Sequence, residues 1–259
     1  MGGADRAAAA ADPRIIVALD EAELGACRRL LAQLCPELCR VKVGKELFCA
    51  LGPDVLHLLV DQGFEVFLDL KFHDIPSTVA AAVRAAARHG VWMINVHTLG
   101  GPAMLAAARE AAGSGAGCPL LIGVTVLTSL DEQQLHAVGI DRPPLEQAAL
   151  LAQLAAAAGL DGVVCSAQEA AALRRHAPPG FVIVTPGIRP AGGGPAPTGA
   201  APAAPDDQHR IMTPAAAIAA GADYLVIGRP ITRSSRPRAQ LAAIHHEVCN
   251  VLTRSKSCS

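Results

Sequence analysis

A short apolar run followed by an alanine-rich helical run recurs eight times along this chain. One copy reads EVFLDLK and then IPSTVAAAVRAAARHG. The apolar runs are nearly continuous, as expected of parallel strands that are covered on both faces. Eight βα units are the number that closes into a (β/α)₈ barrel, so the repeat predicts an α/β fold, a single-domain TIM barrel. The strand runs cover residues 14–20, 39–45, 65–71, 92–97, 119–127, 162–166, 181–187 and 223–229.

An open, doubly wound sheet is the main alternative for such a repeat. It is disfavoured because no G-x-G-x-x-G motif follows the first strand run and no long break divides the chain. A length of 259 residues also suits one barrel. The predicted organisation is a disordered N-terminal extension (1–13), the catalytic barrel (14–252) with a mobile Gly/Pro/Ala loop (191–207), and a polar tail (253–259).

The composition excludes several classes of protein. The net charge of −1 leaves no basic surplus for a nucleic-acid backbone, so no nucleic-acid partner is expected. The apolar runs are interrupted before membrane-spanning length, and the start lacks the basic region of a secretory signal. The eight cysteines form no C-x-x-C pair, which indicates free thiols in a reducing compartment. We therefore expect a cytoplasmic protein without membrane contact.

The segment FLDLKFHDIPST, residues 67–78, places three charges in an apolar run. Asp69 and Lys71 are two positions apart, so on a strand they point to the same face. Asp74 follows just past the expected strand end. A buried cation between two anions is costly to desolvate and is rarely kept for stability alone. The cluster is therefore either a structural ion network or a site of chemistry.

Other polar residues also gather where the strand runs end. Active sites of (β/α)₈ barrels lie at the carboxyl ends of the strands. Only 17% of the residues are charged, so this crowding favours a catalytic ring over a structural one. Reading the ends in order gives Asp20, Lys42, Lys45, Asp69, Lys71, Asp74, His97, Thr128, Ser166, Arg189, Gly228 and Arg229.

The last strand run ends in VIGRPIT, which places Gly228 and Arg229 where such barrels often bind phosphate. A glycine lets backbone N–H groups approach an anion, and a guanidinium can bind two phosphate oxygens at once. The segment TPGIRP supplies a second guanidinium, Arg189, on the neighbouring unit. Together these residues predict a phosphorylated small molecule as the ligand.

Seven blocks of the sequence, taken in order, resemble the orotidine 5′-phosphate decarboxylases of the short bacterial type. The blocks are VALD, VKVGKELF, FLDLKFHDIPSTV, TVLTS, TPGIRP, DDQHRIMTP and DYLVIGRPIT, and they span about residues 14 to 233. The resemblance implies decarboxylation of orotidine 5′-monophosphate to uridine 5′-monophosphate in de novo pyrimidine synthesis. It also implies a homodimer with shared active sites, and neither a cofactor nor a metal.

The resemblance further implies a role for each matching residue. Lys71 would protonate C6 of the pyrimidine within an alternating network of Lys42, Asp69, Lys71 and Asp74. Asp74 and Thr78 would reach into the site of the partner subunit. The substrate-binding residues would be Asp20, Lys42 and Thr78 at the ribose, Thr128 at the pyrimidine edge, and Arg189, Gln208, Gly228 and Arg229 at the phosphate.

Two features depart from the family pattern. The Gly/Pro/Ala loop is longer than expected, and His209 stands where an arginine is expected. Because Gln208 follows that loop, its assignment depends on the DDQHRIMTP block alone.

Two other functions are compatible with parts of this pattern. A metal-dependent sugar-phosphate decarboxylase or aldolase of the same barrel type would use carboxylates to hold a divalent cation. The positive charge of Lys42 would repel such a cation, which disfavours this function. A non-catalytic nucleotide-binding barrel would be expected to lack part of the charged ring, and here every member is present.

Overall fold

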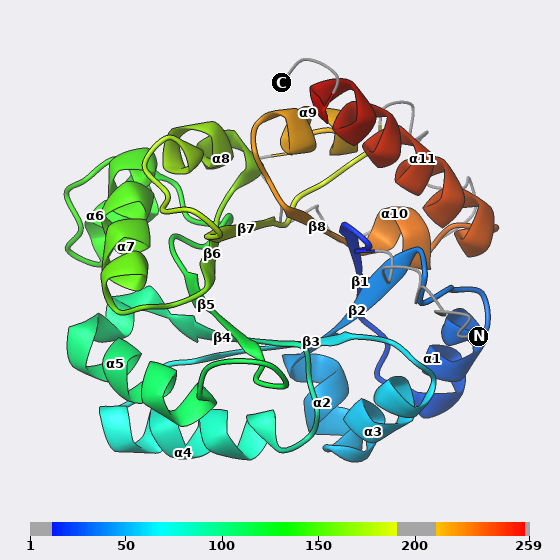
Figure 1. The fold of residues 1–259 in the computed structure, drawn as a ribbon, viewed down its shortest axis with the longest axis horizontal. Helices are drawn as coiled ribbons and strands as arrows, with labels where there is room; N and C mark the ends of the chain where they lie inside the picture. The colour runs from blue at the N-terminus through cyan, green and yellow to red at the C-terminus, as the bar shows by residue number, and fades with distance from the viewer. Residues whose placement is uncertain (1–11, 191–210, 257–259) are drawn as a thin grey trace, which may run out of the picture.

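The structure is a computed structural model that describes residues 12–190 and 211–256. Within these residues, eight parallel strands close into a barrel in the order β1 to β8 (Figure 1). The predicted (β/α)₈ fold is therefore confirmed. The strands are β1 (Ile15–Leu19), β2 (Cys39–Gly44), β3 (Val66–Phe72), β4 (Met93–His97), β5 (Leu120–Val124), β6 (Gly162–Val164), β7 (Val182–Thr185) and β8 (Tyr224–Ile227).

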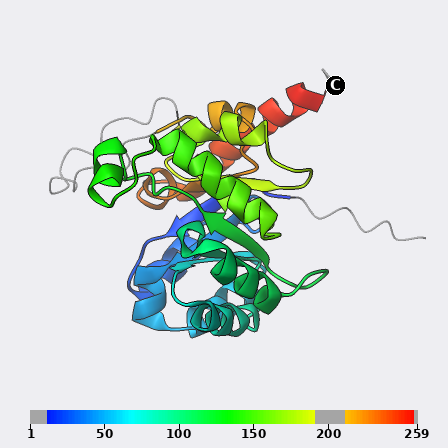
Figure 2. The same ribbon diagram turned by 90° about the vertical axis from the view of Figure 1, so that its left-hand side faces the viewer.

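The helices pack around the outside of the strands, as Figures 1 and 2 show from two directions. Eight of them match the predicted helical runs, whose apolar faces pack on the barrel. They are α1 (Leu24–Leu31), α3 (Asp54–Asp61), α4 (Pro76–Ala87), α5 (Gly101–Ala112), α7 (Pro144–Ala157), α8 (Ala167–Arg174), α9 (Pro214–Ala219) and α11 (Pro237–Lys256).

Three further short helices were not predicted. They are α2 (Lys45–Leu51), α6 (Glu132–Ala137) and α10 (Arg229–Thr232), and a 3₁₀ turn, η1 (Thr98–Gly100), follows β4. Such lengths are too short for a helical periodicity to stand out in the sequence. Each helix follows the carboxyl end of a strand, and in the side view α6 and α10 lie at the same end of the barrel (Figure 2). They therefore frame the mouth where the predicted ring of polar residues gathers.

Alternate side chains of each strand face the two sides of the barrel wall. Outward-facing residues such as Val17, Leu68 and Val96 belong to the large core beneath the helices. The barrel interior has its own smaller core, made of Ile16, Ala18, Phe67, Met93, Ile122, Val184, Tyr224 and Val226. This core fills the part of the barrel toward the amino-terminal ends of the strands. The polar residues of the interior therefore lie toward the carboxyl ends.

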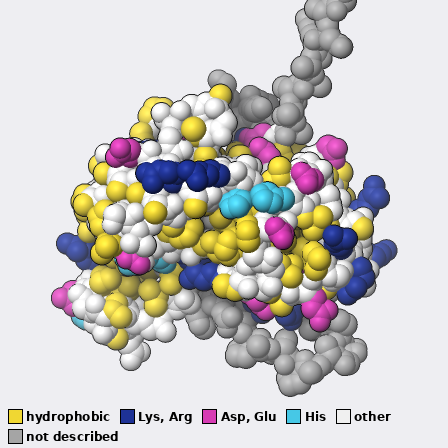
Figure 3. Space-filling model, turned by 90° about the horizontal axis from the view of Figure 1, so that it is seen from below, with side chains coloured by type: hydrophobic (Ala, Val, Ile, Leu, Met, Phe, Trp, Pro, Cys, Tyr) yellow, Lys and Arg dark blue, Asp and Glu magenta, His cyan; other side chains and the backbone are white. Residues whose placement is uncertain are grey.

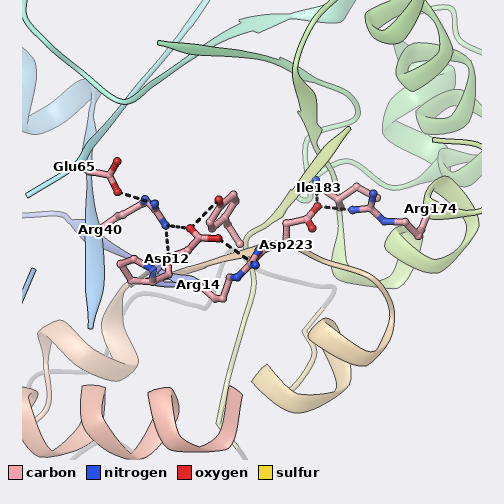
Figure 4. A network of polar contacts seen from close by, with 9 residues as sticks. Asp12, Arg14, Arg40, Glu65, Arg174, Ile183 and Asp223 are labelled. Carbon is pink, nitrogen blue, oxygen red and sulfur yellow. Dashed lines mark hydrogen bonds and ion pairs between the residues drawn. The ribbon is translucent and has the colours of Figure 1, made fainter. Parts of the chain in front are cut away.

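The amino-terminal end of the barrel is closed by Arg40, whose side chain is almost fully buried (Figure 4). Its guanidinium lies 4.0 Å from the ring centroid of Trp92 and 4.9 Å from that of Tyr224. It also forms ion pairs with Asp12 at 2.9 Å and Glu65 at 2.6 Å. A buried charge is costly to leave unpaired, so Arg40 depends on these partners at the end opposite the mouth.

The two ends of the chain differ from the predicted boundaries. Asp12, assigned to the N-terminal extension, binds Arg40 and accepts a hydrogen bond from the Tyr224 hydroxyl at 3.1 Å, and Pro13 is buried. Helix α11 continues to Lys256, past the predicted end of the barrel at 252. The contacts of Asp12 therefore add residues 12 and 13 to the barrel domain, and the length of α11 adds residues 253–256. Residues 1–11 and the 191–207 loop lie outside the described residues.

The surface over α3, α4 and α5 shows hydrophobic side chains interspersed with both signs of charge (Figure 3). Among the described residues, no helix is both long and apolar enough to cross a membrane. The seven cysteines of the described residues are all free thiols.

Candidate active site

A cavity of about 380 Å³ opens at the carboxyl ends of the strands. Its lining brings together eight of the residues that the sequence predicted for the site: Asp20, Lys42, Asp69, Lys71, Thr128, Arg189, Gly228 and Arg229. They come from strands and loops spread over most of the chain, so barrel closure is what assembles them. Apolar side chains such as Val124, Val126 and Val226 supply the rest of the wall.

Asp69 is the centre of the charged cluster on one side of the cavity. Its Oδ1 accepts a hydrogen bond from Lys71 Nζ at 2.6 Å, and its Oδ2 lies 3.1 Å from Lys42 Nζ. The Asp69 side chain is only 10% exposed, and that of Lys71 is 26% exposed. Lys71 therefore keeps access to the cavity while its ammonium group is held by the carboxylate.

Asn95 on β4 joins the same cluster and was not predicted. Its Nδ2 donates to Asp69 Oδ1 at 2.7 Å, and its Oδ1 accepts from the backbone N–H of Lys71 at 2.8 Å. Within the described residues, Lys71 is the one non-glycine residue with a positive φ, at 53°. Asn95 could have been suspected as the single amide in the apolar run WMINVH, two positions before His97.

The charges around Asp69 determine its protonation. Burial by itself would raise the pKa of Asp69, but the ammonium groups of Lys42 and Lys71 and the hydrogen bonds from Lys71 and Asn95 outweigh burial. The pKa of this carboxyl therefore lies below its ordinary value. At neutral pH Asp69 is an anion between two cations.

His97 lies at the end of β4 beside this cluster, with its ring centroid 5.3 Å from that of His73. Burial and then the positive charges of His73, Lys71 and Lys45 lower the pKa of His97 to about 4, although Asp69 acts in the opposite direction. His97 is therefore a neutral imidazole at neutral pH, and it adds no charge to the cluster.

Arg189, Gly228 and Arg229, the residues predicted to bind a phosphate, lie on the other side of the barrel. In the closed strand order, β7 and β8 stand four strands away from β3 and β4. Arg189 follows β7, where its backbone N–H donates to the Met212 carbonyl at 2.9 Å. Arg229 follows Gly228 directly after β8. Two guanidinium groups thus line the cavity across from the Lys–Asp–Lys cluster.

Gly228 lies at a close approach between two strand ends. A Cβ atom there would lie 3.1 Å from Asp20 Oδ2, on the neighbouring strand end. A Cβ atom would therefore oblige the exposed Asp20 side chain to shift by a few tenths of an ångström. Glycine therefore lets the Asp20 carboxylate and the chain leading to Arg229 share one edge of the cavity.

Two predicted residues among those described, Asp74 and Thr78, are not part of the cavity wall. Asp74 and Thr78 lie in the exposed segment 73–78, and the Asp74 carboxylate accepts a hydrogen bond from the Ile75 N–H at 2.6 Å. Asp74 therefore does not complete the Lys42–Asp69–Lys71 network within one chain. Gln208 lies outside the described residues. Ser129 and Cys165 line the cavity without having been predicted.

The site offers little to a metal ion. In residues 12–190 and 211–256, no group of three or more His, Cys, Asp or Glu side chains is arranged to hold one. Both carboxylate oxygens of Asp69 already bind ammonium groups. The donor set therefore suits an organic anion better than a divalent cation.

These features define a class: a (β/α)₈ barrel enzyme whose mouth pairs a lysine held by a carboxylate with two arginines on the opposite wall. A family model described as orotidine 5′-phosphate decarboxylase / HUMPS family matches residues 13–244. The chain belongs to this family, as its sequence resemblance predicted.

Individual relatives agree over nearly the whole chain. Orotidine 5′-phosphate decarboxylase of Halorhodospira halophila is 55% identical over 236 residues, covering 91% of this chain and 96% of the relative. The protein of the same name from Pseudomonas aeruginosa strain LESB58 is 56% identical over 235 residues, covering 90% and 97%. The crystal structure of orotidine 5′-phosphate decarboxylase from Lactobacillus acidophilus superposes with a TM-score of 0.78 at 38% identity, covering 92% and 99%.

Proposed function

We propose that this protein decarboxylates orotidine 5′-monophosphate to uridine 5′-monophosphate, with Lys71 as charge stabiliser and proton donor. The observation that carries the proposal is the Lys42–Asp69–Lys71 cluster facing two arginines across one cavity. The family and the names of relatives above 50% identity support the reaction. The roles of individual residues are those that the family resemblance implies, and the positions of the residues around the cavity support them.

Loss of CO₂ from C6 leaves an electron pair in the plane of the pyrimidine ring, where no π-system can delocalise it. The enzyme must stabilise this charge electrostatically, and a fixed ammonium group next to the carbon does so directly. Lys71 supplies that group and then transfers one of its protons to C6, so the carbanion becomes a C–H bond. Lys71 is left as a neutral amine and is reprotonated from solvent. Asp69 orients the ammonium group throughout.

The remaining lining residues bind the rest of the nucleotide. Arg189, Gly228 and Arg229 suit the phosphate, because guanidinium groups bind its oxygens in pairs. Asp20 follows β1 and Lys42 lies on β2, the two strands between β8 and β3, so the ribose would pass them, and Thr128 would bind the pyrimidine edge. Gln208 is proposed as a further phosphate ligand from the sequence alone. Binding energy gained at the phosphate can then support the chemical step at C6.

A homodimer with shared sites accounts for the exposed segment 73–78. It holds two of the proposed site residues, Asp74 and Thr78, together with Ile75, which is 64% exposed. An exposed isoleucine next to two site residues fits a two-fold interface that carries Asp74 and Thr78 to the partner's cavity. The free thiols and the biosynthetic reaction support a cytoplasmic location.

A metal-dependent sugar-phosphate enzyme of the same barrel type is the alternative. It would need a carboxylate with free oxygens, and Asp69 has both of its oxygens bound by Lys42 and Lys71. The alternative predicts loss of activity with a chelator and its recovery with Mg²⁺. The proposed reaction predicts full activity under the same treatment.

The test is the loss of orotidine 5′-monophosphate absorbance when purified protein is added in excess chelator. Lys71→Ala should lower kcat by at least about 10³-fold, because it removes both the charge and the proton donor. Arg88→Ala removes an exposed positive charge at the end of α4 and serves as the matched control. Near-normal kcat in the Lys71 variant would exclude the proposed role of this lysine.

A further inference from the structure

The pairing of β3 with β4 is interrupted where the cluster lies. Leu68 pairs with Ile94 and Phe72 pairs with Val96, so three residues of β3 stand opposite Asn95 alone. An excess of residues on one strand is a bulge, and bulges re-aim side chains near active sites. Lys71 is the last residue of this bulge, and its left-handed φ of 53° is part of it.

A bulge leaves backbone groups without their strand partners, and the side chain of Asn95 supplies one. Asn95 is fully buried on the inner face of β4. The Lys71 N–H can only donate and the ionised Asp69 carboxylate can only accept, so the amide orientation of Asn95 is determined by its two partners. One side chain therefore contacts both the backbone of Lys71 and the carboxylate that holds its ammonium group.

We propose that Asn95 is a positioning residue for the reaction, which holds Lys71 in its left-handed conformation and orients the Asp69 carboxylate. Lysine rarely adopts this backbone conformation, and such conformations persist when surrounding contacts determine them. Without Asn95 the backbone of Lys71 can relax toward ordinary strand geometry, which turns its side chain relative to the cavity. The effect on kcat depends on the proposed function, but the effect on the Lys71 backbone does not.

Two substitutions separate the two contacts. Asn95→Leu has a similar volume and removes both hydrogen bonds. Asn95→Asp keeps an acceptor for the Lys71 N–H but places a second carboxylate against Asp69. Thr98→Val is the matched control, because Thr98 is also fully buried and its hydroxyl has no hydrogen-bond partner among the described residues.

The first readout does not require activity. In protein labelled with ¹⁵N-lysine, hydrogen exchange of the Lys71 amide should become at least about tenfold faster in Asn95→Leu. It should stay near the wild-type rate in Asn95→Asp and in Thr98→Val. An unchanged exchange rate in Asn95→Leu would overturn the proposal whether or not the protein decarboxylates its proposed substrate.

The second readout is a split between catalysis and binding. Both Asn95 variants should lose at least about tenfold in kcat, while KM and the calorimetric stoichiometry of uridine 5′-monophosphate binding stay close to wild type. A purely structural role would instead lower kcat and binding stoichiometry together, and this result would overturn the proposal. Wild-type kcat in both variants would do so as well. Inactive wild-type protein would refute the proposed function and leave the exchange result to decide on Asn95.

Discussion

Individual residues at the mouth of the barrel show how a few buried charges are kept in defined states. Asp69 stays ionised despite its burial because two ammonium groups and an amide contact it. His97, which lies beside the cluster at the end of β4, stays neutral at neutral pH because its pKa is lowered to about 4. Burial disfavours the charged form of both groups, but the adjacent ammonium groups reverse its effect for the Asp69 carboxylate and add to it for the His97 imidazole.

The lowered pKa of His97 predicts a pH-dependent stability. The folded value is about 4 against an ordinary 6.5, so between these values the unfolded chain binds a proton that the folded chain does not. The free energy of unfolding should therefore decrease as the pH falls from about 6.5 to about 4, by part of the roughly 1.4 kcal/mol per pH unit that one proton can contribute. Urea unfolding at several pH values measures this slope.

His97→Gln should flatten that slope, since glutamine does not titrate in this range. His176→Gln, at an exposed position, is the control and should leave the slope unchanged. Asp69 adds a separate effect at lower pH. Its lowered pKa gives stability that is present above about 3.8 and is lost as the pH falls through the folded value. A slope in His97→Gln equal to that of wild type between pH 4 and 6.5 would contradict the assignment.

At the scale of elements, the barrel depends on close approach between neighbouring strands. Gly162 begins β6 and pairs with Val182 of β7. A Cβ atom at position 162 would lie 2.2 Å from the Val182 carbonyl oxygen, which no rotamer change can relieve. The short β6 therefore pairs with β7 only because this residue has no side chain.

Gly162→Ala should destabilise the protein by about 2 to 3 kcal/mol, because backbone must move to admit the methyl group. Gly25→Ala makes the same chemical change at an exposed position of helix α1, where the nearest atom to the new Cβ is in the Arg29 guanidinium at 3.5 Å. That substitution should be neutral or stabilising by up to about 1 kcal/mol. Denaturant unfolding of both variants tests the pair, and equal effects would show that strand contact is not the cause.

The molecule as a whole separates stability from chemistry along the barrel axis. The buried Arg40 cluster closes the amino-terminal end, the apolar interior core fills the middle, and the cavity occupies the carboxyl end. Within the cavity, the strand order sets the lysine cluster and the arginines on opposite walls. A ligand with an anionic group at one end and its reacting carbon at the other fits that division.

The shared active site is a prediction at this scale, and mixing two inactive variants tests it. Lys71→Ala and Asp74→Asn proteins, unfolded together and refolded in equal amounts, should form mixed dimers in about half of all pairings. Each mixed dimer would have one site with both residues intact, so about a quarter of the wild-type activity should return. If Asp74 serves its own subunit, the mixture stays inactive although native mass spectrometry detects the mixed dimers.

The sequence by itself predicted the barrel, because eight apolar runs alternating with alanine-rich runs leave few other ways to bury both faces of a parallel sheet. It also predicted eight of the residues that line the cavity, since strand ends in a barrel converge on one mouth. The short helices α2, α6 and α10 lacked the length to give a periodic signal. These results all depend on local patterns repeated along the chain.

The tertiary structure decided what depends on contacts between distant segments. Asp69 and Lys71 are neighbours in sequence, but the bulge of β3 and the left-handed backbone of Lys71 appear only when β4 pairs alongside. Asn95 carries no charge and sits in an apolar strand, so its role depends on which atoms lie across from it. Asp74 shares a motif with Lys71, yet it is exposed and does not line the cavity of its own chain, because strand β3 ends at Phe72 and Asp74 lies in the turn before α4.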